Sequence, residues 1–176
     1  MRLFFALLPT PAQSEALVAA IASLVQQLEG QPVLASNVHA TLRFIGTVEA
    51  QRLDALRDAA AQVRGRHVTL QFDSLEVWEK PEILCATAGE SDAARDLSAA
   101  LQRAAIAAGV TPDARPFRAH LTLARKVRRR VARNFEWPRA LAPVNVHCDR
   151  FVLMESRRVD ARSTYSVVDS WPLYER

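Results

Sequence analysis

The sequence predicts an α+β fold made of two related lobes, whose antiparallel sheets face each other across a central cleft. One observation is a repeated motif: His-x-Thr-Leu occurs at His39–Leu42 and again at His120–Leu123. A second is that each copy lies in a strand-like stretch with helix-like, Ala-rich segments nearby. A third is the length of 176 residues with 49% apolar content, which suits one domain with a substantial core. We therefore expect a single bilobal domain over residues 1–176, with its helices on the outside.

The first half of the chain alternates strand-like and helix-like segments. In order, we expect a strand at 3–8, a helix at 12–28, a strand at 38–45 and a helix at 50–63. The strand at 3–8 is a continuous apolar run, which is typical of a buried central strand. In the first helix, apolar residues recur at helical spacing, and Gly30 follows as a helix end. Gly46 closes the strand that carries the first motif.

The second half is richer in strands. In order, we expect strands at 68–78 and 83–88, a helix at 91–108, and strands at 119–123, 144–154 and 163–168. Val68, Leu70 and Phe72 alternate with other residues, so they share one face of their strand. Ser91 is a typical helix-capping residue, and Gly109 ends the helix. A polar loop is expected between the last two strands.

The repeated motif supplies groups for acid–base chemistry. Side chains alternate between the faces of a strand, so a histidine and the threonine two residues later point the same way. Each copy therefore offers one imidazole and one hydroxyl, from His39 and Thr41 and from His120 and Thr122. Brought together, these groups could cleave a phosphate ester without a metal, with one imidazole as base, the other as acid and the hydroxyls on the phosphoryl oxygens.

What the sequence lacks narrows the chemistry further. A Gly-rich phosphate loop of the Walker type is missing, which argues against ATP hydrolysis. Neither a carboxylate-rich cluster nor a His-x-x-x-His pair is present, so we expect no metal and no cofactor. The other two histidines, His67 and His147, lie outside any His-x-Thr setting and are expected to be structural. Cys85 and Cys148 have no metal or redox spacing and are expected to be buried, reduced thiols.

The charge of the chain is mildly basic and unevenly distributed. The formal net charge of +4 is compatible with a polyanionic partner. A run free of acidic residues contains Arg125, Lys126, Arg128, Arg129, Arg130 and Arg133. Such a run is most often a solvated loop. Because this one directly follows the second motif, Arg128, Arg129 and Arg130 are also candidates for contact with a phosphate backbone.

Several stretches of the chain resemble the 2H phosphoesterases, and within them the RNA 2′,3′-cyclic phosphodiesterases, formerly called 2′-5′ RNA ligases. The likeness is carried by Arg2–Leu7, His39–Phe44, Arg115–Arg125, Ser163–Tyr165 and Trp171–Leu173. The resemblance implies the same bilobal architecture with pseudo-two-fold symmetry. It also implies that each lobe contributes one histidine to a common site.

The resemblance assigns roles that the residues alone leave open. Because the two motifs are nearly identical, the sequence itself does not distinguish the acid from the base. The family implies that His39 is the proton donor and His120 the proton acceptor. On that scheme His120 activates water and His39 protonates the departing O3′, which leaves a 2′-phosphate, while Thr41 and Thr122 hold the non-bridging oxygens.

Two further positions, each five residues after a motif histidine, also match the family. Phe44 is implied to lie near the terminal base, and Arg125 near the phosphate. Strict alternation would place both on the face opposite the histidine, so each strand must twist, bulge or end first. Arg43 departs from the family, where a small residue is usual. Alternation puts Arg43 on the His39 side, so we expect it to contact an anion or point into solvent.

The leading interpretation is metal-independent hydrolysis of RNA 2′,3′-cyclic phosphate ends to 2′-phosphate ends. One alternative is the reverse reaction, an ATP-independent joining of a cyclic end to a 5′-hydroxyl that gives a 2′-5′ bond. Another is a phosphodiesterase for small cyclic nucleotides, such as ADP-ribose 1″,2″-cyclic phosphate. A last one is a non-catalytic module that binds RNA ends, against which the complete pair of motifs argues.

The partner and the location of the chain are also expected from the sequence. The partner is RNA or a nucleotide with a 2′,3′-cyclic phosphate, and we expect a monomer. The apolar run at 3–8 is too short for a membrane span, and the sequence after it has no small-residue cleavage site of a secretory signal. We therefore expect a cytoplasmic protein without a membrane partner.

Overall fold

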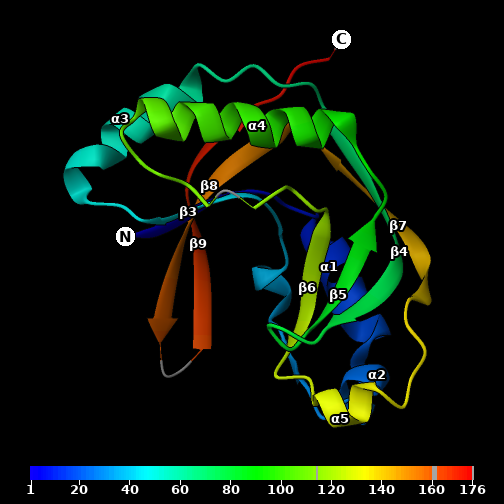
Figure 1. Cartoon of the computed structure of the whole chain (residues 1–176). Helices are drawn as coiled ribbons and strands as arrows, with labels where there is room; N and C mark the ends of the chain where they lie inside the picture. The colour runs from blue at the N-terminus through cyan, green and yellow to red at the C-terminus, as the bar shows by residue number, and fades with distance from the viewer. Residues whose placement is uncertain (114, 160–161, 176) are drawn as a thin grey trace.

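The computed structural model describes residues 1–113, 115–159 and 162–175, which form two antiparallel sheets flanked by helices (Figure 1). The first sheet has the strand order β3-β1-β8-β9 and the second has the order β2-β6-β5-β4-β7. The strands of the first sheet are β1 (Arg2–Leu7), β3 (Ala40–Thr47), β8 (Arg150–Val159) and β9 (Arg162–Pro172). Those of the second are β2 (Gln31–Pro32), β4 (Val68–Trp78), β5 (Ile83–Ala88), β6 (His120–Arg125) and β7 (Arg139–Cys148).

The helices divide between the two sheets. They are α1 (Pro11–Ala20), α2 (Ala22–Gln27), the 3₁₀ turn η1 (Ala35–Asn37), α3 (Ala50–Ala61), α4 (Asp92–Ala107) and the short α5 (Arg129–Ala132). Helices α3 and α4 contact each other and the strands of the first sheet, whereas α1 and α2 lie behind β5 and β6 of the second (Figure 1). Thr10 caps α1 in a capping box and Ser91 caps α4, as the sequence predicts for Ser91.

The two sheets repeat one arrangement of strands. In the first, β3 pairs with β1, the strand that precedes it across α1 and α2; in the second, β6 pairs with β5, the strand that precedes it across α4. The order β3-β1-β8-β9 thus corresponds to β6-β5-β4-β7. This correspondence confirms the predicted fold class, because each motif opens the equivalent strand of a related lobe.

A continuous apolar core lies under both sheets. Phe5, Phe72 and Phe151 are fully buried within it, and each such side chain stabilises the fold by roughly 1.5–3 kcal/mol relative to exposure. The Leu17-to-Leu28 face of the first helical segment is buried as predicted. Within the described residues, none of the helices has the length and apolarity that a membrane crossing requires.

Three expectations about the elements are wrong or lie outside the described chain. The helix predicted at 12–28 is interrupted at Ile21, which separates α1 from α2. The strand predicted at 144–154 is two strands, because the chain leaves the second sheet after Cys148 and enters the first at Arg150. The alternation of Val144, Val146 and Cys148 gives way at Asp149 and Arg150 to a continuous apolar run at 151–154, with no Gly or Pro to mark the change of sheet. Residues 160–161 of the predicted polar loop lie outside the described residues.

Candidate active site

The two motif histidines are held in the same way, one in each lobe. His39 directly precedes β3 and His120 opens β6, and these two strands contact each other across the lobes. The Nδ1 atom of His39 lies 2.7 Å from the carbonyl oxygen of Asn37, and that of His120 lies 2.8 Å from the carbonyl oxygen of Arg118. A carbonyl oxygen can only accept, so each Nδ1 carries a proton and donates it. Each Nε2 is therefore left with the lone pair that can exchange a proton with a ligand.

Burial and neighbouring cations make both imidazoles weak bases. Burial lowers the pKa of His39 from 6.5 to about 4, and the positive charges of Arg125 and His120 lower this pKa as well. Burial is also the largest influence on His120, whose pKa is lowered further by the charges of Arg118 and Arg125. The hydrogen bonds to the carbonyl oxygens oppose these effects without cancelling them. Both rings are therefore neutral at pH 7 in the free protein.

The first motif strand carries a β-bulge three residues after its histidine. Thr41 and Arg43 pair with consecutive residues of β1, so Leu42 between them is an extra residue. A bulge interrupts the alternation of side chains between the two faces. Leu42 and Arg43 are accordingly both buried, at 2% and 7% exposure, and Phe44 returns to the side of the sheet that carries the imidazole.

The second motif strand has its bulge at the equivalent position. Thr122 and Ala124 pair with consecutive residues of β5, so Leu123 is extra. Leu123 and Ala124 are both fully buried, and Arg125 after them is exposed. The sequence required a twist, a bulge or a strand end to bring the fifth residue to the histidine side. Both strands have a bulge. This geometry brings the fifth residue after each histidine to the side of the site.

Phe44 and Arg125 meet other side chains at the junction of the lobes. Phe44 is half-buried, and the guanidinium group of Arg2 lies 4.9 Å above the centre of its ring. Arg125 reaches from the second lobe to the first, where its Nη2 donates to the hydroxyl oxygen of Tyr165 at 3.3 Å. Thr41 and Thr122 are half-buried on the two motif strands. The junction thus combines hydroxyl groups, an aromatic ring and a guanidinium group around the two imidazoles.

The expectation for Arg43 is wrong. Its guanidinium group neither faces the His39 side nor points into solvent, because the bulge at Leu42 turns the side chain into the protein interior. There its Nη1 donates to the carbonyl oxygens of Asp113 and Arg115. Arg43 is therefore unavailable for direct contact with a bound anion.

Aromatic residues outside the predicted site surround both imidazoles. The ring centre of His39 lies 4.8 Å from that of Phe4 and 5.0 Å from that of Tyr165. The ring centre of His120 lies 4.6 Å from that of Trp78. Phe4 and Tyr165 belong to stretches that resemble the family, and that resemblance is the signal that could have found them. Trp78 belongs to no such stretch, and only the assembled sheets bring it to the site.

A half-buried carboxylate stabilises the surroundings of His120. Glu76 accepts hydrogen bonds from Nη2 of Arg118 at 2.6 and 2.7 Å, from Nε1 of Trp78 at 3.1 Å and from the hydroxyl of Thr87 at 3.2 Å. Burial raises the pKa of Glu76, but the hydrogen bonds from Trp78 and Arg118 outweigh it and the pKa is lowered. Arg118 also lies 4.8 Å above the Trp78 ring. The carboxylate thereby holds both the ring beside His120 and the residue whose carbonyl oxygen orients it.

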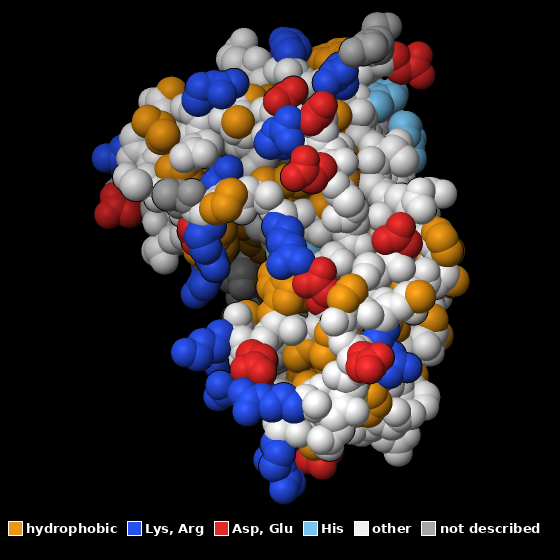
Figure 2. All heavy atoms as spheres, turned by 45° about the vertical axis from the view of Figure 1, so that its right-hand side comes forward, with side chains coloured by type: hydrophobic (Ala, Val, Ile, Leu, Met, Phe, Trp, Pro, Cys, Tyr) orange, Lys and Arg blue, Asp and Glu red, His pale blue; other side chains and the backbone are white. Residues whose placement is uncertain are grey.

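The basic run is more ordered and more neutralised than a solvated loop. Helix α5 forms within it, and three of its arginines make ion pairs with acids from elsewhere in the chain. The pairs are Arg128–Glu29, Arg129–Glu82 and Arg133–Glu79. Lysine and arginine side chains nevertheless border the recess between the two lobes on the face shown in Figure 2. Contact between this run and RNA stays a prediction.

The remaining candidates lie outside the site. His67 and His147 pack against each other with ring centres 5.3 Å apart. Cys85 and Cys148 are buried and free, as predicted, and burial raises their thiol pKa values to about 12 and about 11. In the part of the chain that the structure describes, no three His, Cys, Asp or Glu residues group closely enough to hold a metal ion.

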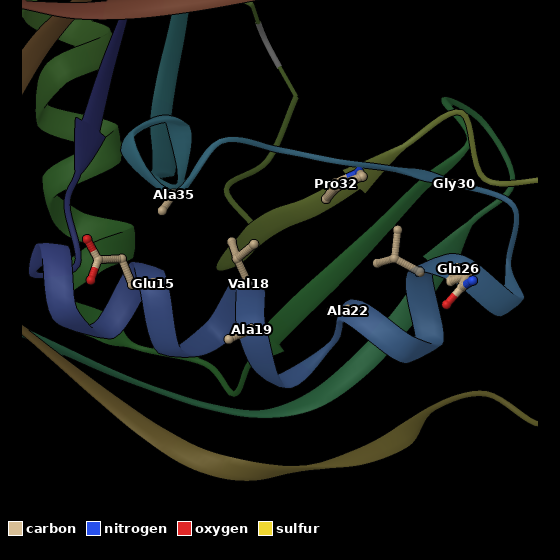
Figure 3. Close-up of a pocket in the computed structure, with 9 residues that line it drawn as sticks. Glu15, Val18, Ala19, Ala22, Gln26, Gly30, Pro32 and Ala35 are labelled. Atoms are coloured by element: carbon tan, nitrogen blue, oxygen red, sulfur yellow. The ribbon is translucent and has the colours of Figure 1, made fainter.

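An apolar groove of about 550 Å³ lies between α1, α2 and the segment at residues 30–35 (Figure 3). Glu15 is the ionisable residue among those that line it, and the lining includes neither motif. We therefore assign no part of the acid–base chemistry to this groove.

Comparison with known proteins agrees with the geometry. Residues 9–160 match the family model of the 2′-5′ RNA ligase superfamily, which covers most of the chain. The chain belongs to the 2′-5′ RNA ligase superfamily. This match confirms the family that the sequence motifs indicate, and with it the expectation that the chain is an enzyme.

A relative in sequence and two solved structures are similar to most of the chain. The RNA 2′,3′-cyclic phosphodiesterase of Escherichia coli strain K12 is 29% identical over 148 residues, which are 82% of this chain and 80% of the relative. The crystal structure of E. coli LigT in complex with 3′-AMP has a TM-score of 0.87 at 27% identity, with 99% of this chain and 98% of that chain covered. TT0787 of Thermus thermophilus has a TM-score of 0.72 at 21% identity over 99% of both chains, which supports the fold alone.

Proposed function

We propose that this enzyme hydrolyses RNA 2′,3′-cyclic phosphate ends to 2′-phosphate ends with two histidines and no metal. The observation that carries the proposal is the matched pair of imidazoles, one from each lobe, with both Nδ1 atoms on backbone carbonyl oxygens and both Nε2 atoms available. The name of the E. coli relative supports the same substrate. We further propose that residues 1–176 act as one bilobal domain, a cytoplasmic monomer.

The proposed reaction is an in-line displacement at phosphorus. Nε2 of His120 takes a proton from water as the water oxygen bonds to phosphorus. The P–O3′ bond breaks on the opposite side, and O3′ takes the proton from Nε2 of His39. The product keeps the phosphate on O2′. Each proton transfer of this kind typically contributes about 10²–10⁴-fold to the rate.

The remaining site residues would bind and orient the phosphate and the base. The hydroxyls of Thr41 and Thr122 would donate to the non-bridging oxygens, and Arg125 can form paired hydrogen bonds to the same group. Phe44, whose ring also contacts the Arg2 guanidinium group, would stack on the terminal base. Tyr165, which receives a hydrogen bond from Arg125, would hold that guanidinium group toward the phosphate.

The roles of acid and base follow the family resemblance, and the pKa values of the free protein do not assign them. Burial lowers the pKa of His39 to about 4 and also lowers the pKa of His120, so the acid must gain its proton when the substrate binds. A bound phosphate anion beside His39 would raise the pKa of that ring and favour its protonation for the reaction.

These pKa shifts predict an acidic optimum for kcat/KM. One imidazole must be protonated, and in the free enzyme both pKa values lie below 6.5. We expect kcat/KM for adenosine 2′,3′-cyclic phosphate to fall about tenfold per pH unit above pH 6.5. The falling limb of kcat should lie at higher pH, because the bound phosphate raises the imidazole pKa. Imidazole NMR should show His39 titrating near 4; titration of His39 near 6.5 would contradict the proposed environment.

The direct test of the function uses an RNA oligonucleotide with a 2′,3′-cyclic phosphate end in the presence of EDTA. We expect the cyclic end to be opened at an undiminished rate. Loss of activity with EDTA that one specific divalent metal restores would contradict the metal-free mechanism. Adding an RNA with a 5′-hydroxyl end tests the reverse reaction, since a joined 2′-5′ product would favour the ligase alternative.

The basic run predicts a salt-dependent contribution to RNA binding. We expect the triple variant Arg128→Ala, Arg129→Ala, Arg130→Ala to bind RNA more weakly and to reduce the slope of log K against log salt by up to about 2–3. Because Arg128 and Arg129 already pair with glutamates, we expect the reduction in this slope to lie toward the lower end of that range.

The matched control removes the same charge from α3, the turn after it and α4, through Arg52→Ala, Arg64→Ala and Arg103→Ala. Fluorescence anisotropy with labelled RNA over a range of KCl gives both slopes. Equal slopes for the two triple variants would show that the basic run does not contact RNA and has a structural role alone. Turnover of adenosine 2′,3′-cyclic phosphate should be nearly unchanged in both.

A further inference from the structure

The guanidinium group of Arg43 is a buried cation that the proposed reaction does not use. The residue is 7% exposed and lies between β3, α4 and the segment that leads to β6. Its Nη1 donates to the carbonyl oxygens of Asp113 at 2.8 Å and Arg115 at 2.9 Å, and its Nη2 donates to the hydroxyl of Ser98 at 2.9 Å. A buried charge is costly unless hydrogen bonds satisfy it, and here Nη1 and Nη2 are satisfied while Nε has no partner among the described residues.

One end of this network fixes the bulge of the first motif. Ser98 on α4 is fully buried, accepts from Arg43 and donates to the carbonyl oxygen of Leu42 at 2.6 Å. Leu42 is the extra residue of the bulge, so its carbonyl group leaves the regular ladder and needs another partner. Arg43 and Ser98 together therefore stabilise the turn of the strand that brings Phe44 back to the site.

The other end fixes the approach to the second motif. Asp113 and Arg115 lie in the connection from α4 to β6, and the backbone N–H of Asp113 donates to the carbonyl oxygen of Phe44 at 3.0 Å. Arg115 precedes Arg118 by three residues, and the carbonyl oxygen of Arg118 orients the His120 ring. Arg43 is thus linked to His120 through its hydrogen bond to Arg115, the backbone from Arg115 to Arg118, and the carbonyl oxygen of Arg118.

We propose that Arg43 is a positioning residue that fixes the first motif relative to the second across the lobes. The inference deepens the proposed two-histidine function and rests on it. A planar guanidinium group can reach three acceptors in fixed directions, whereas the ammonium of lysine is a compact charge on a flexible chain. Because the side chain is buried away from the site, it acts through the placement of His39 and His120 and not on the substrate.

The test compares Arg43→Met, which keeps an unbranched chain without donors, with Arg43→Lys, which keeps the charge. We expect kcat for adenosine 2′,3′-cyclic phosphate to fall about 30–100-fold in both, the loss typical of a misplacement of about 1 Å. KM should change less than kcat, because Thr41, Thr122 and Arg125 are retained and the stacking of Phe44 on the base is the binding contact that loosens. The imidazole NMR signals of His39 and His120 should shift at 25 °C, which a mere loss of stability would not cause.

The control is Arg52→Met, which removes another arginine bond to the same connection. Arg52 donates to the carbonyl oxygen of Gly109 at 2.9 Å but contacts neither motif, so kcat should be unchanged. Wild-type kcat in a folded Arg43→Lys variant would overturn the inference. If Arg43→Met fails to fold, Ser98→Ala takes its place, and wild-type kcat in that variant would likewise overturn the inference.

His39→Ala distinguishes failure of the proposed function from failure of this inference. If His39→Ala stays active, the proposed function is wrong; if it is inactive, the Arg43 variants test the positioning role alone.

Discussion

Replacing either motif histidine with alanine is expected to remove almost all hydrolysis of a 2′,3′-cyclic phosphate. His39→Ala and His120→Ala should each lower kcat/KM by about 10²–10⁴-fold, because each removes one of the two proton transfers. The double variant should be little worse than either single one, since the acid and base act as a unit. Initial rates with adenosine 2′,3′-cyclic phosphate measure all three.

The structure offers a matched control for these variants. His67 and His147 pack against each other outside the motifs, so alanine at either position should leave kcat/KM unchanged. Thermal unfolding followed by circular dichroism checks that His39→Ala still folds, because that ring packs against Phe4 and Tyr165. Full activity in either motif variant would rule out the two-histidine mechanism.

Arg125 is expected to give the next largest effect. Two hydrogen bonds from its guanidinium group to a phosphate are worth about 3–4 kcal/mol, so Arg125→Met should lower kcat/KM by roughly 10²–10³-fold. Arg125→Lys keeps the charge but not the paired geometry and should recover about tenfold of that loss. Both imidazole pKa values should rise in Arg125→Met, because the charge of Arg125 lowers them in the wild type.

Arg150→Met is the matched control, because Arg150 is an exposed arginine paired with Asp149 outside the site. It should leave the kinetics unchanged. If Arg125→Met kept wild-type kcat/KM while the imidazole pKa values rose, the residue would act on the electrostatics of the site alone. That outcome would remove it from the phosphate-binding group.

The sequence predicted that each lobe holds one motif histidine because the motif is local and occurs twice. A histidine and a threonine two residues apart lie on the same face of any regular strand. The repetition indicated that His39 and His120 belong to one site. The wrong expectation for Arg43 came from the same alternation rule, carried past Leu42, where the strand bulges. A bulge depends on how β3 pairs with β1 and packs under α4, and a single strand does not reveal that.

Other features depend on contacts between distant segments. Trp78 lies beside His120 only after the sheets assemble, and it belongs to no local motif. The change of sheet at Asp149 is marked in the sequence by two adjacent polar residues but by no Gly or Pro, so the predicted strand ran through it. The acids that pair with the basic run lie far from it in sequence, so the sequence alone did not reveal these ion pairs.

The identity of the product tests the central claim most directly. The claim is that His120 activates water on one side of the phosphorus while His39 protonates O3′ on the other, with Phe44 and Arg125 fixing the ribose. Phosphorus NMR of adenosine 2′,3′-cyclic phosphate turned over in EDTA should show adenosine 2′-phosphate as the single product. Adenosine 3′-phosphate would mean that the ribose is bound in reverse or that the acid and base are exchanged. A mixture of the two products would mean that Phe44 and Arg125 do not orient the ribose. Unchanged substrate would contradict the proposed reaction itself.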